Sequence, residues 1–133
     1  MEKQVVGWMD AQPMGLGPHG MWPQGVRVGN VIFLQGQSAF DMQGNLVGLN
    51  DPGAQARNAC ANIRAILAEL GAQMTDVAKI TVYITDVVFR PAVYEAITEA
   101  FNGWCPCSTG LVVKGLARPE LLVEIDAYAV IAG

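Results

Sequence analysis

The sequence predicts one α+β domain in which two helices pack on one face of a β-sheet. A chain of 133 residues is long enough for a single domain with its own hydrophobic core. Several short segments alternate apolar and polar residues, as strands do, and two longer segments repeat apolar residues with helical spacing. The predicted element order over residues 1–133 is β-β-β-α-β-α-β-β. The face of the sheet without helices would be largely apolar, so we expect self-association to cover it.

The first third of the chain contains a loop and a hairpin. Residues 15–25 hold many glycines and prolines without periodicity, which predicts an irregular loop. Residues 26–35 have β-branched residues on both sides of Gly29-Asn30, which predicts two short strands joined by a tight turn. Gly36-Gln37 is expected to end the second of these strands. Two further elements are a turn at 41–45 and a short strand at 46–47.

The first helix is indicated at both of its ends. Asn50 or Asp51 can cap the first turn with a side-chain oxygen, and Pro52 suits the first helical position. Apolar residues then recur at steps of three and four up to Leu70, and Gly71 is a natural end. The polar side of this helix is predicted to consist of Gln55, Arg57, Asn58, Arg64 and Glu69.

The second half of the chain contains three predicted strands and one helix. Residues 79–85 alternate apolar and polar side chains, which indicates a strand. A helix is expected from about Pro91 to Asn102, because apolar residues form one stripe along this segment. Residues 111–113 and 121–131 are the last two predicted strands.

The composition restricts the class of protein. Only 15% of the residues are charged, against about 25% in an average soluble domain, while 52% are apolar. A small protein with so little polar surface often buries the excess between subunits, so we expect a homo-oligomer. The formal net charge is −4 and Lys and Arg are not clustered, which argues against a nucleic-acid partner. No apolar run approaches the ~20 residues of a membrane span, and the first residues lack a signal-peptide pattern, so we expect a cytoplasmic protein.

The three cysteines, Cys60, Cys105 and Cys107, are predicted to be free thiols. An odd number of cysteines is not a disulfide framework, and Pro106 separates two of them too tightly for a comfortable bridge. Cys105, Cys107 and His19 match zinc-ligand spacing poorly, so no metal is expected. Cys107 could act as a nucleophile, but without a basic neighbour its thiol would be mostly protonated and inert.

Glu124 stands in the middle of the last predicted strand, among residues expected to be buried. Burying an unpaired carboxylate is costly unless the group is protonated or finds a partner. Glu124 can therefore be an acid–base group with a raised pKa or a structural acid hydrogen-bonded to backbone, and the sequence leaves both open. His19, the only histidine, lies in the irregular loop, where a solvated side chain is the simpler interpretation.

A set of segments follows a distinctive order from about residue 15 to the end of the chain. The set comprises residues 31–37, Gln55, 62–67, Gly71, 79–86, Tyr94, Phe101, Pro106 and 122–127. In these segments the chain resembles the RidA/YjgF/UK114 (Rid) family. The resemblance implies a chorismate-mutase-like mixed sheet and a homotrimer with clefts between its subunits. It also implies hydrolysis of reactive enamines and imines, such as 2-aminoacrylate, to a keto acid and ammonia without a metal or cofactor.

The resemblance further implies where a site would lie. In the family's enzymes an arginine just after a proline grips the substrate carboxylate, and a glutamate on the last strand positions or activates water. Glu124 matches that glutamate, but Ser108 stands where the arginine is expected. The family's cysteine, asparagine and tyrosine fall at Gly110, Pro91 and His19. Besides the acid–base residue Glu124, the residues predicted to bind substrate are Ser108, Cys107, His19, Gly36, Gln37 and Tyr94.

Ser108 changes the substrate that such a site can hold. A serine hydroxyl makes one neutral hydrogen bond, whereas an arginine makes two charge-assisted ones, a difference of ~2 kcal/mol or more. Arg90, Arg118 or Arg27 could supply a guanidinium from another position, although nothing in the sequence indicates it. Efficient hydrolysis of small 2-imino acids is therefore not the default expectation.

Two functions remain open at this point. The first is a hydrolase of an enamine, an imine or a related adduct, with Glu124 as the acid–base residue, which is not a typical 2-imino acid deaminase. The second is a non-catalytic trimer that binds a small molecule or another protein through the same cleft. Trp22 and Trp104 lie near the presumed cleft and would either give it an aromatic wall or serve ordinary packing.

Overall fold

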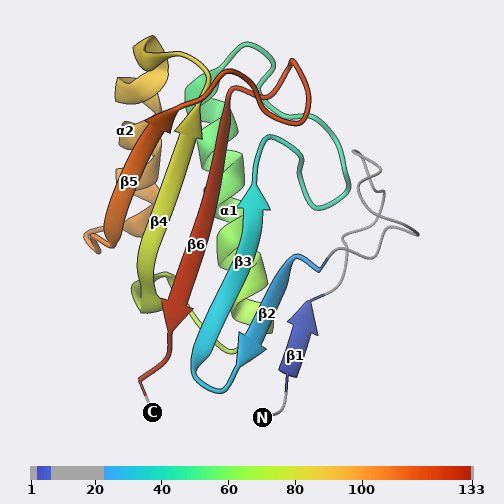
Figure 1. Cartoon of the computed structure of the whole chain (residues 1–133), viewed down its shortest axis with the longest axis vertical. Coiled ribbons are helices and arrows are strands. Elements are labelled where there is room, and N and C mark those ends of the chain that lie inside the picture. The colour runs from blue at the N-terminus through green and yellow to red at the C-terminus, as the bar shows by residue number, and fades with distance from the viewer. Residues whose placement is uncertain (1–2, 7–22, 133) are drawn as a thin grey trace.

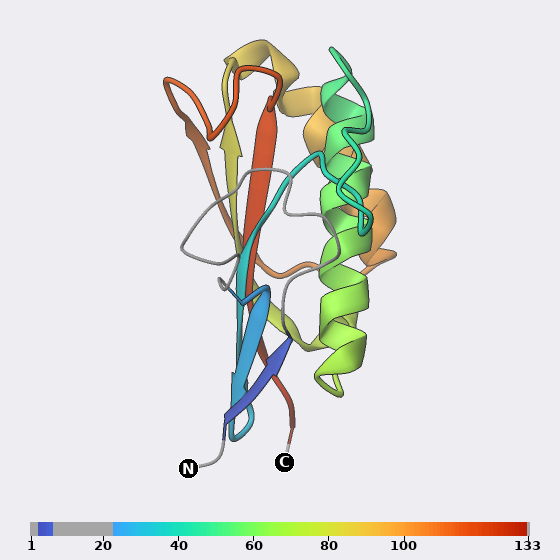
Figure 2. The ribbon, with the colours of Figure 1, turned by 90° about the vertical axis from the view of Figure 1, so that its right-hand side faces the viewer.

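The computed structural model describes residues 3–6 and 23–132. It contains one six-stranded mixed sheet with two α-helices on the same face, which confirms the predicted α+β fold class (Figure 1, Figure 2). The strands are β1 (Lys3–Val6), β2 (Gly25–Val28), β3 (Val31–Gln37), β4 (Val77–Ile84), β5 (Cys107–Val112) and β6 (Val123–Val130). The helices are α1 (Pro52–Glu69) and α2 (Arg90–Phe101), with two single-turn 3-10 helices at Met74–Asp76 and Val87–Phe89.

The order of strands in the sheet is β1-β2-β3-β6-β4-β5. β2 and β3 form the predicted hairpin around Gly29-Asn30, where Gly29 has a φ of 60°. All neighbouring strands are antiparallel except β4 and β5. These two are parallel because the chain crosses back through α2 between them. β6 lies between β3 and β4, so Glu124 belongs to an interior strand of the sheet.

The last two strands differ from the predicted ranges. β5 begins at Cys107, earlier than the predicted strand at 111–113, because residues 107–110 are polar, small or glycine and show no apolar alternation. The whole of β5 is solvent-exposed at the edge of the sheet. Neither of its faces is buried, so its sequence does not alternate apolar and polar residues. β6 covers Val123–Val130 rather than the predicted 121–131.

Two shorter features also differ from the predictions. Residues 46–47 form no strand, and Leu46 makes only an isolated bridge to Phe40. β1 was not predicted, and it pairs antiparallel with β2 at the other edge of the sheet. Its four residues are too few for an alternating pattern to stand out. The predicted loop at 15–25 falls for the most part outside the described residues.

α1 begins at the predicted cap. The carboxylate of Asp51 accepts a hydrogen bond from the backbone N–H of Ala54 at 3.0 Å, and Pro52 occupies the first turn. Gly71, with a φ of 81°, follows the end of the helix. The prediction that Gln55 lies on the polar side is wrong, because this side chain is fully buried.

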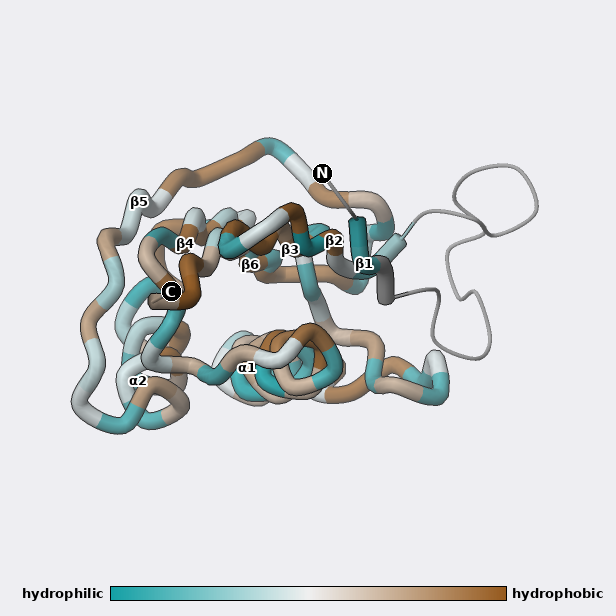
Figure 3. The backbone as a smooth tube through the Cα atoms, turned by 90° about the horizontal axis from the view of Figure 1, so that it is seen from below, coloured by the Kyte–Doolittle hydropathy of each residue, from teal (hydrophilic) through white to brown (hydrophobic). Residues whose placement is uncertain are grey.

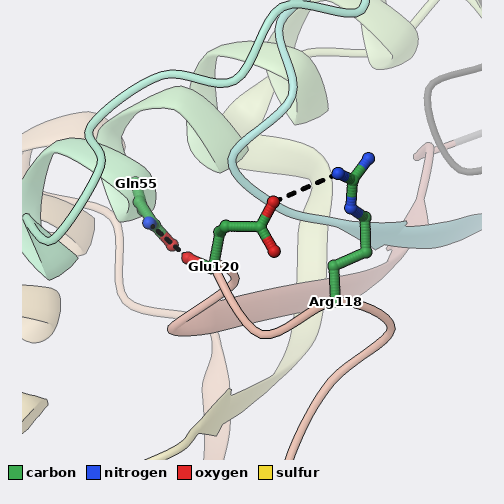
Figure 4. A network of polar contacts seen from close by, with 3 residues as sticks. All are labelled: Gln55, Arg118 and Glu120. Carbon is green, nitrogen blue, oxygen red and sulfur yellow. Dashed lines mark hydrogen bonds and ion pairs between the residues drawn. The ribbon is translucent and has the colours of Figure 1, made fainter.

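The amide of Gln55 connects α1 to the segment that leads into β6. Its Nε2 donates to the carbonyl oxygens of Gly48 at 3.1 Å and Glu120 at 3.0 Å, while its Oε1 accepts from the backbone N–H of Leu122 at 2.9 Å. Figure 4 shows the contact with Glu120, whose carboxylate forms an ion pair with Arg118 at 3.1 Å. The amide thus holds the start of β6 at a fixed place relative to the helix.

α2 agrees closely with the helix predicted from Pro91 to Asn102. It covers Arg90–Phe101, and Asn102 ends it in the left-handed conformation with a φ of 46°. Figure 3 shows the sheet and the two helices as separate layers, and the hydrophobic core lies between them. Its fully buried members include Ile32, Ile63, Ile66, Leu67, Val82, Val93, Val123 and Ile125.

The other face of the sheet carries exposed apolar side chains. Val31 lies opposite Val130, and Phe33 lies opposite Tyr128, on β3 and β6. The rings of Phe33 and Tyr128 meet edge to face with centroids 5.7 Å apart, and all four side chains are exposed. Both helices lie on the opposite side (Figure 2). Among the described residues, no helix is long and apolar enough to cross a membrane.

Candidate functional site

Glu124 lies half-buried on β6, on the face of the sheet that the helices leave open. It is paired with Tyr83 of β4, whereas its neighbours Val123 and Ile125 point into the core. Its carboxylate packs over Gly36 of β3, where a Cβ atom would stand 2.5 Å from Oε2. Gly36, one of the residues predicted to bind substrate, therefore leaves the space that the carboxylate of Glu124 occupies.

Asp126 forms a carboxylate pair with Glu124, because residues two apart on a strand share a face. The Tyr83 hydroxyl donates to Oδ2 of Asp126 at 3.0 Å. Oδ1 of Asp126 is buried without a hydrogen-bond partner in the described part of the chain. Burial, followed by the neighbouring charge of Asp126, raises the pKa of Glu124 above its usual value. A carboxyl group in this state holds its proton to a higher pH than an exposed one does, which suits a group that passes protons to and from a ligand.

Ser108 lies on β5 beside helix α2. Its Oγ is 3.1 Å from the Tyr94 hydroxyl, so the structure brings together two of the predicted binding residues. Ser108 pairs with Ile80 of β4, and Ile80 is buried under the helices. Paired residues of neighbouring strands share a face, so Ser108 points to the helix side of the sheet.

Ser108 and Glu124 consequently point to opposite faces of the sheet. Glu124 pairs with Tyr83, three residues along β4 from Ile80, and an odd spacing on a strand reverses the face. The two groups therefore do not meet within one chain. A single site that contained both would need the β5 edge of one copy and the open face of another.

Gln37 and Cys107 take no part in the contact between Tyr94 and Ser108. The Gln37 amide is buried and donates to Oε1 of Gln24 at 2.8 Å and to the carbonyl of Gln35 at 3.1 Å. Cys107 pairs with Lys79 on β4, one position from Ser108 and on the opposite face. The only histidine, His19, and Trp22 lie outside the described residues.

The cysteine side chains agree with the sequence-based expectation of free thiols. Cys60, Cys105 and Cys107 are all free, as predicted. Burial raises the pKa of the Cys60 thiol to about 12, which makes it a poor nucleophile. Within residues 3–6 and 23–132, no group of three acidic, histidine or cysteine side chains is placed to hold a metal ion.

A small cavity opens beside Ser108 and Tyr94, between β5 and α2. Its volume is about 150 Å³ and its wall is mostly apolar. Trp104 contributes to this wall and donates its indole N–H to the carbonyl of Val77 at 2.8 Å. The other residues that line the cavity include Ile80, Ile97, Phe101 and Pro106.

The three arginines considered as substitutes for the missing carboxylate-binding arginine have different surroundings. Arg27 donates to two backbone carbonyls at 2.8 Å each, and Arg118 pairs with Glu120. Arg90 instead stacks on the ring of Tyr94, with Cζ 4.4 Å from the ring centroid. Of the three, Arg90 alone lies next to Ser108 and its partner. The sequence could not make this choice, because it depends on how α2 packs against β5.

Comparison with known proteins gives consistent matches over almost the whole chain. A sequence model of the family described as Endoribonuclease L-PSP matches residues 14–131. A RutC family protein of Pyrococcus abyssi is 33% identical over 129 residues, which cover 97% of this chain and 98% of that protein. Rv2704 of Mycobacterium tuberculosis, a member of the YjgF/YER057c/UK114 family, is 27% identical with a TM-score of 0.82, covering 98% of this chain and all of that one. E. coli TdcF with bound serine is 27% identical with a TM-score of 0.80, covering 97% of this chain and 100% of that chain.

Proposed function

The chain belongs to the Rid family, also called YjgF/YER057c/UK114, and on this premise we propose that it hydrolyses a small enamine, imine or related adduct. Glu124 is the proposed acid–base residue. The site is a cleft between subunits of a homotrimer, and no metal or cofactor takes part.

The proposed reaction needs one water molecule and one residue that moves protons. The water oxygen bonds to the imine carbon, and the resulting amino alcohol loses its nitrogen as ammonia to leave a carbonyl group. Glu124 accepts a proton from the attacking water and passes it to the imine nitrogen, and the hydroxyl proton of the amino alcohol then moves to the same nitrogen as the C–N bond breaks. An enamine substrate first takes a proton on carbon to become the imine.

The observation that carries the proposal is the state of the Glu124 carboxyl group. It is half-buried over Gly36, its pKa is raised, and within the described residues it makes no hydrogen bond. A structural carboxylate would be expected to have partners, because an unpaired buried charge is costly. A carboxyl group held without partners is suited to bind water or substrate.

Two features support assembly into a homotrimer. The open face of the sheet exposes Val31, Phe33, Tyr128 and Val130, which together form an apolar surface that a second copy could cover. The opposite orientations of Ser108 and Glu124 also favour a site shared between copies. The number of subunits in the oligomer, three, is inferred from the family.

The nature of the ligand is inferred from size and charge. E. coli TdcF holds serine, a small amino acid, which supports a small metabolite as the ligand here. The name of the matched family model mentions a ribonuclease, but the net charge of −4 without a basic cluster gives RNA little attraction. We therefore favour a small metabolite over a nucleic acid.

A non-catalytic binding protein is the second candidate. The observation in its favour is Ser108, which replaces the arginine that grips the substrate carboxylate in the family's enzymes. Such a protein would bind a small molecule or another protein in the same cleft without releasing ammonia.

The experiment that separates the two candidates measures ammonia release from short-lived imines. An amino-acid oxidase generates 2-imino acids in the assay, and an amine oxidase generates uncharged imines. Wild-type protein is expected to accelerate the release from at least one imine, and Glu124→Gln is expected to lose about 100-fold or more of that rate. Glu99→Gln, which alters an exposed carboxylate on α2, should retain it.

Light scattering should show the same oligomer for all three proteins, so that loss of rate is not loss of assembly. Acceleration that survives in Glu124→Gln contradicts the proposed role of this residue. No acceleration with any imine favours the binding protein.

A further inference from the structure

The guanidinium of Arg90 occupies space that a side chain at position 110 would fill. A Cβ atom built on Gly110 would stand 2.6 Å from Nη1 of Arg90 and 2.7 Å from the hydroxyl of Tyr94. Because Gly110 has no side chain, Arg90 and Tyr94 can reach across from α2 and lie directly on β5. Glycine weakens a strand, so its presence here is better explained by this close approach than by strand formation.

The Arg90 side chain keeps its hydrogen-bond donors available. Its Cζ lies over the ring of Tyr94, 4.4 Å from the centroid, and this cation–π contact restricts the place of the guanidinium without using any of its N–H donors. Within the part of the chain that the structure describes, Arg90 makes no hydrogen bond or ion pair. An exposed arginine held in one orientation is prepared to bind a planar anion through two parallel hydrogen bonds.

Ser108 and Gly110 together explain why the guanidinium comes from the helix. They are alternate residues of β5, so both face α2 and lie about 7 Å apart along the strand. Ser108 is where the family's enzymes have their arginine, and both residues here are small. The positive charge therefore comes from the facing helix, next to Gly110, and not from the strand itself.

The apolar cavity lies toward the other end of the same surface. The hydroxyl pair of Tyr94 and Ser108 borders it, and Trp104, Ile97 and Phe101 form much of its wall. Its volume of about 150 Å³ equals that of a protein cavity known to admit benzene. A cation, two hydroxyls and an apolar cavity therefore follow one another along β5.

We propose that Arg90 is the anion-binding residue of this site and that the ligand is a small organic acid with an apolar substituent. The carboxylate binds the edge of the Arg90 guanidinium, the two hydroxyls contact the adjacent polar atoms, and the substituent enters the cavity. The assignment of this ligand to the hydrolytic site rests on the proposed function, whereas the binding itself does not.

Calorimetric binding of stable keto acids to the full chain tests this proposal. The probes are 4-methyl-2-oxopentanoate, its uncharged amide, and pyruvate, which has the same acid group without the larger substituent. The wild-type protein should bind 4-methyl-2-oxopentanoate about tenfold or more tightly than the amide, because only the acid pairs with the guanidinium. It should also bind this acid about tenfold or more tightly than pyruvate, because three more carbons are buried.

Three variants assign the preference to Arg90 and to its position. Arg90→Met should abolish the preference for the acid over the amide, and Arg90→Lys should restore part of it, since the charge returns without the paired donors. Gly110→Ala keeps the charge but displaces the guanidinium, so the preference should fall. Arg57→Met, which removes an exposed arginine on α1, should bind all three probes as the wild type does.

An unchanged preference in Arg90→Met overturns the proposal, as does equal binding of pyruvate and 4-methyl-2-oxopentanoate by the wild type. Glu124→Gln separates this outcome from failure of the proposed function. If this variant binds the keto acid normally and no protein releases ammonia, the anion site stands and the hydrolase does not. If ammonia release depends on Glu124 while Arg90→Met keeps the acid preference, the hydrolase stands and the anion site does not.

Discussion

At the scale of single residues, the raised pKa and the packing of the Glu124 carboxyl group depend on neighbours from other positions in the sequence. Gly36 provides the space, Asp126 adds a neighbouring charge, and Tyr83 holds that second carboxylate in place. Glu124 could be singled out from the sequence because an acid in an apolar strand is unusual. The contributions of Gly36 and Tyr83 could not, because they come from other strands.

The raised pKa of Glu124 predicts a specific dependence of stability on pH. The folded protein holds the proton at pH values where the unfolded chain, with a pKa near 4.5, has released it. The free energy of unfolding should therefore be highest below that value and should fall as pH rises through the raised pKa. Glu124→Gln cannot ionise and should lack this decrease.

Urea unfolding at a series of pH values and one protein concentration measures the effect. The difference in free energy of unfolding between Glu124→Gln and the wild type should grow as pH rises. A difference that is constant from acid to neutral pH would show that the pKa of Glu124 is not raised in the folded protein.

At the scale of secondary-structure elements, signals at the ends of a segment were more informative than its average composition. Asp51, Pro52 and Gly71 placed α1, because caps require particular side chains and backbone angles. β5 was placed too late, since an exposed edge strand is under no pressure to alternate. Gln55 was assigned to the polar side because the sequence does not distinguish a buried glutamine from an exposed one. Only its hydrogen-bond partners in the fold do so.

The hydrogen bonds of Gln55 predict a large loss of stability on substitution. Gln55→Leu would leave two carbonyl oxygens and the N–H of Leu122 without their partner, at a cost of about 2–4 kcal/mol in the free energy of unfolding. Gln43→Leu, at an exposed position, should change it by less than about 0.5 kcal/mol. Chemical denaturation of both variants checks this, and equal small effects would mean that water replaces the buried amide.

At the scale of the whole molecule, the two faces of the sheet have different surroundings. One face is covered by α1 and α2 (Figure 2) and forms the core. The other face presents apolar side chains and Glu124. Low charge content in the sequence was enough to predict that some apolar surface would remain. Which arginine lies beside Ser108 could not be predicted, because the choice of Arg90 depends on the packing of α2 against β5.

The apolar face predicts that a charge placed there would disrupt the oligomer. Phe33→Asp should dissociate the assembly, because burying an unpaired carboxylate between subunits is unfavourable. Val88→Asp introduces the same charge at an equally apolar and more exposed position away from this face, and it should leave the oligomer unchanged. Light scattering distinguishes the two, and an intact oligomer in Phe33→Asp would contradict assembly through this face.

A mixture of two inactive variants tests most directly whether the site is shared between subunits. Glu124→Gln removes the acid–base group, and Ser108→Asp places a negative charge beside Tyr94 on the other face. If each site combines β5 of one subunit with Glu124 of another, hybrid oligomers should regain about a quarter of the wild-type rate of ammonia release, the random share of interfaces with both residues intact. If hybrids form, as mass spectrometry would show, and no activity returns, the two residues do not belong to a site between subunits.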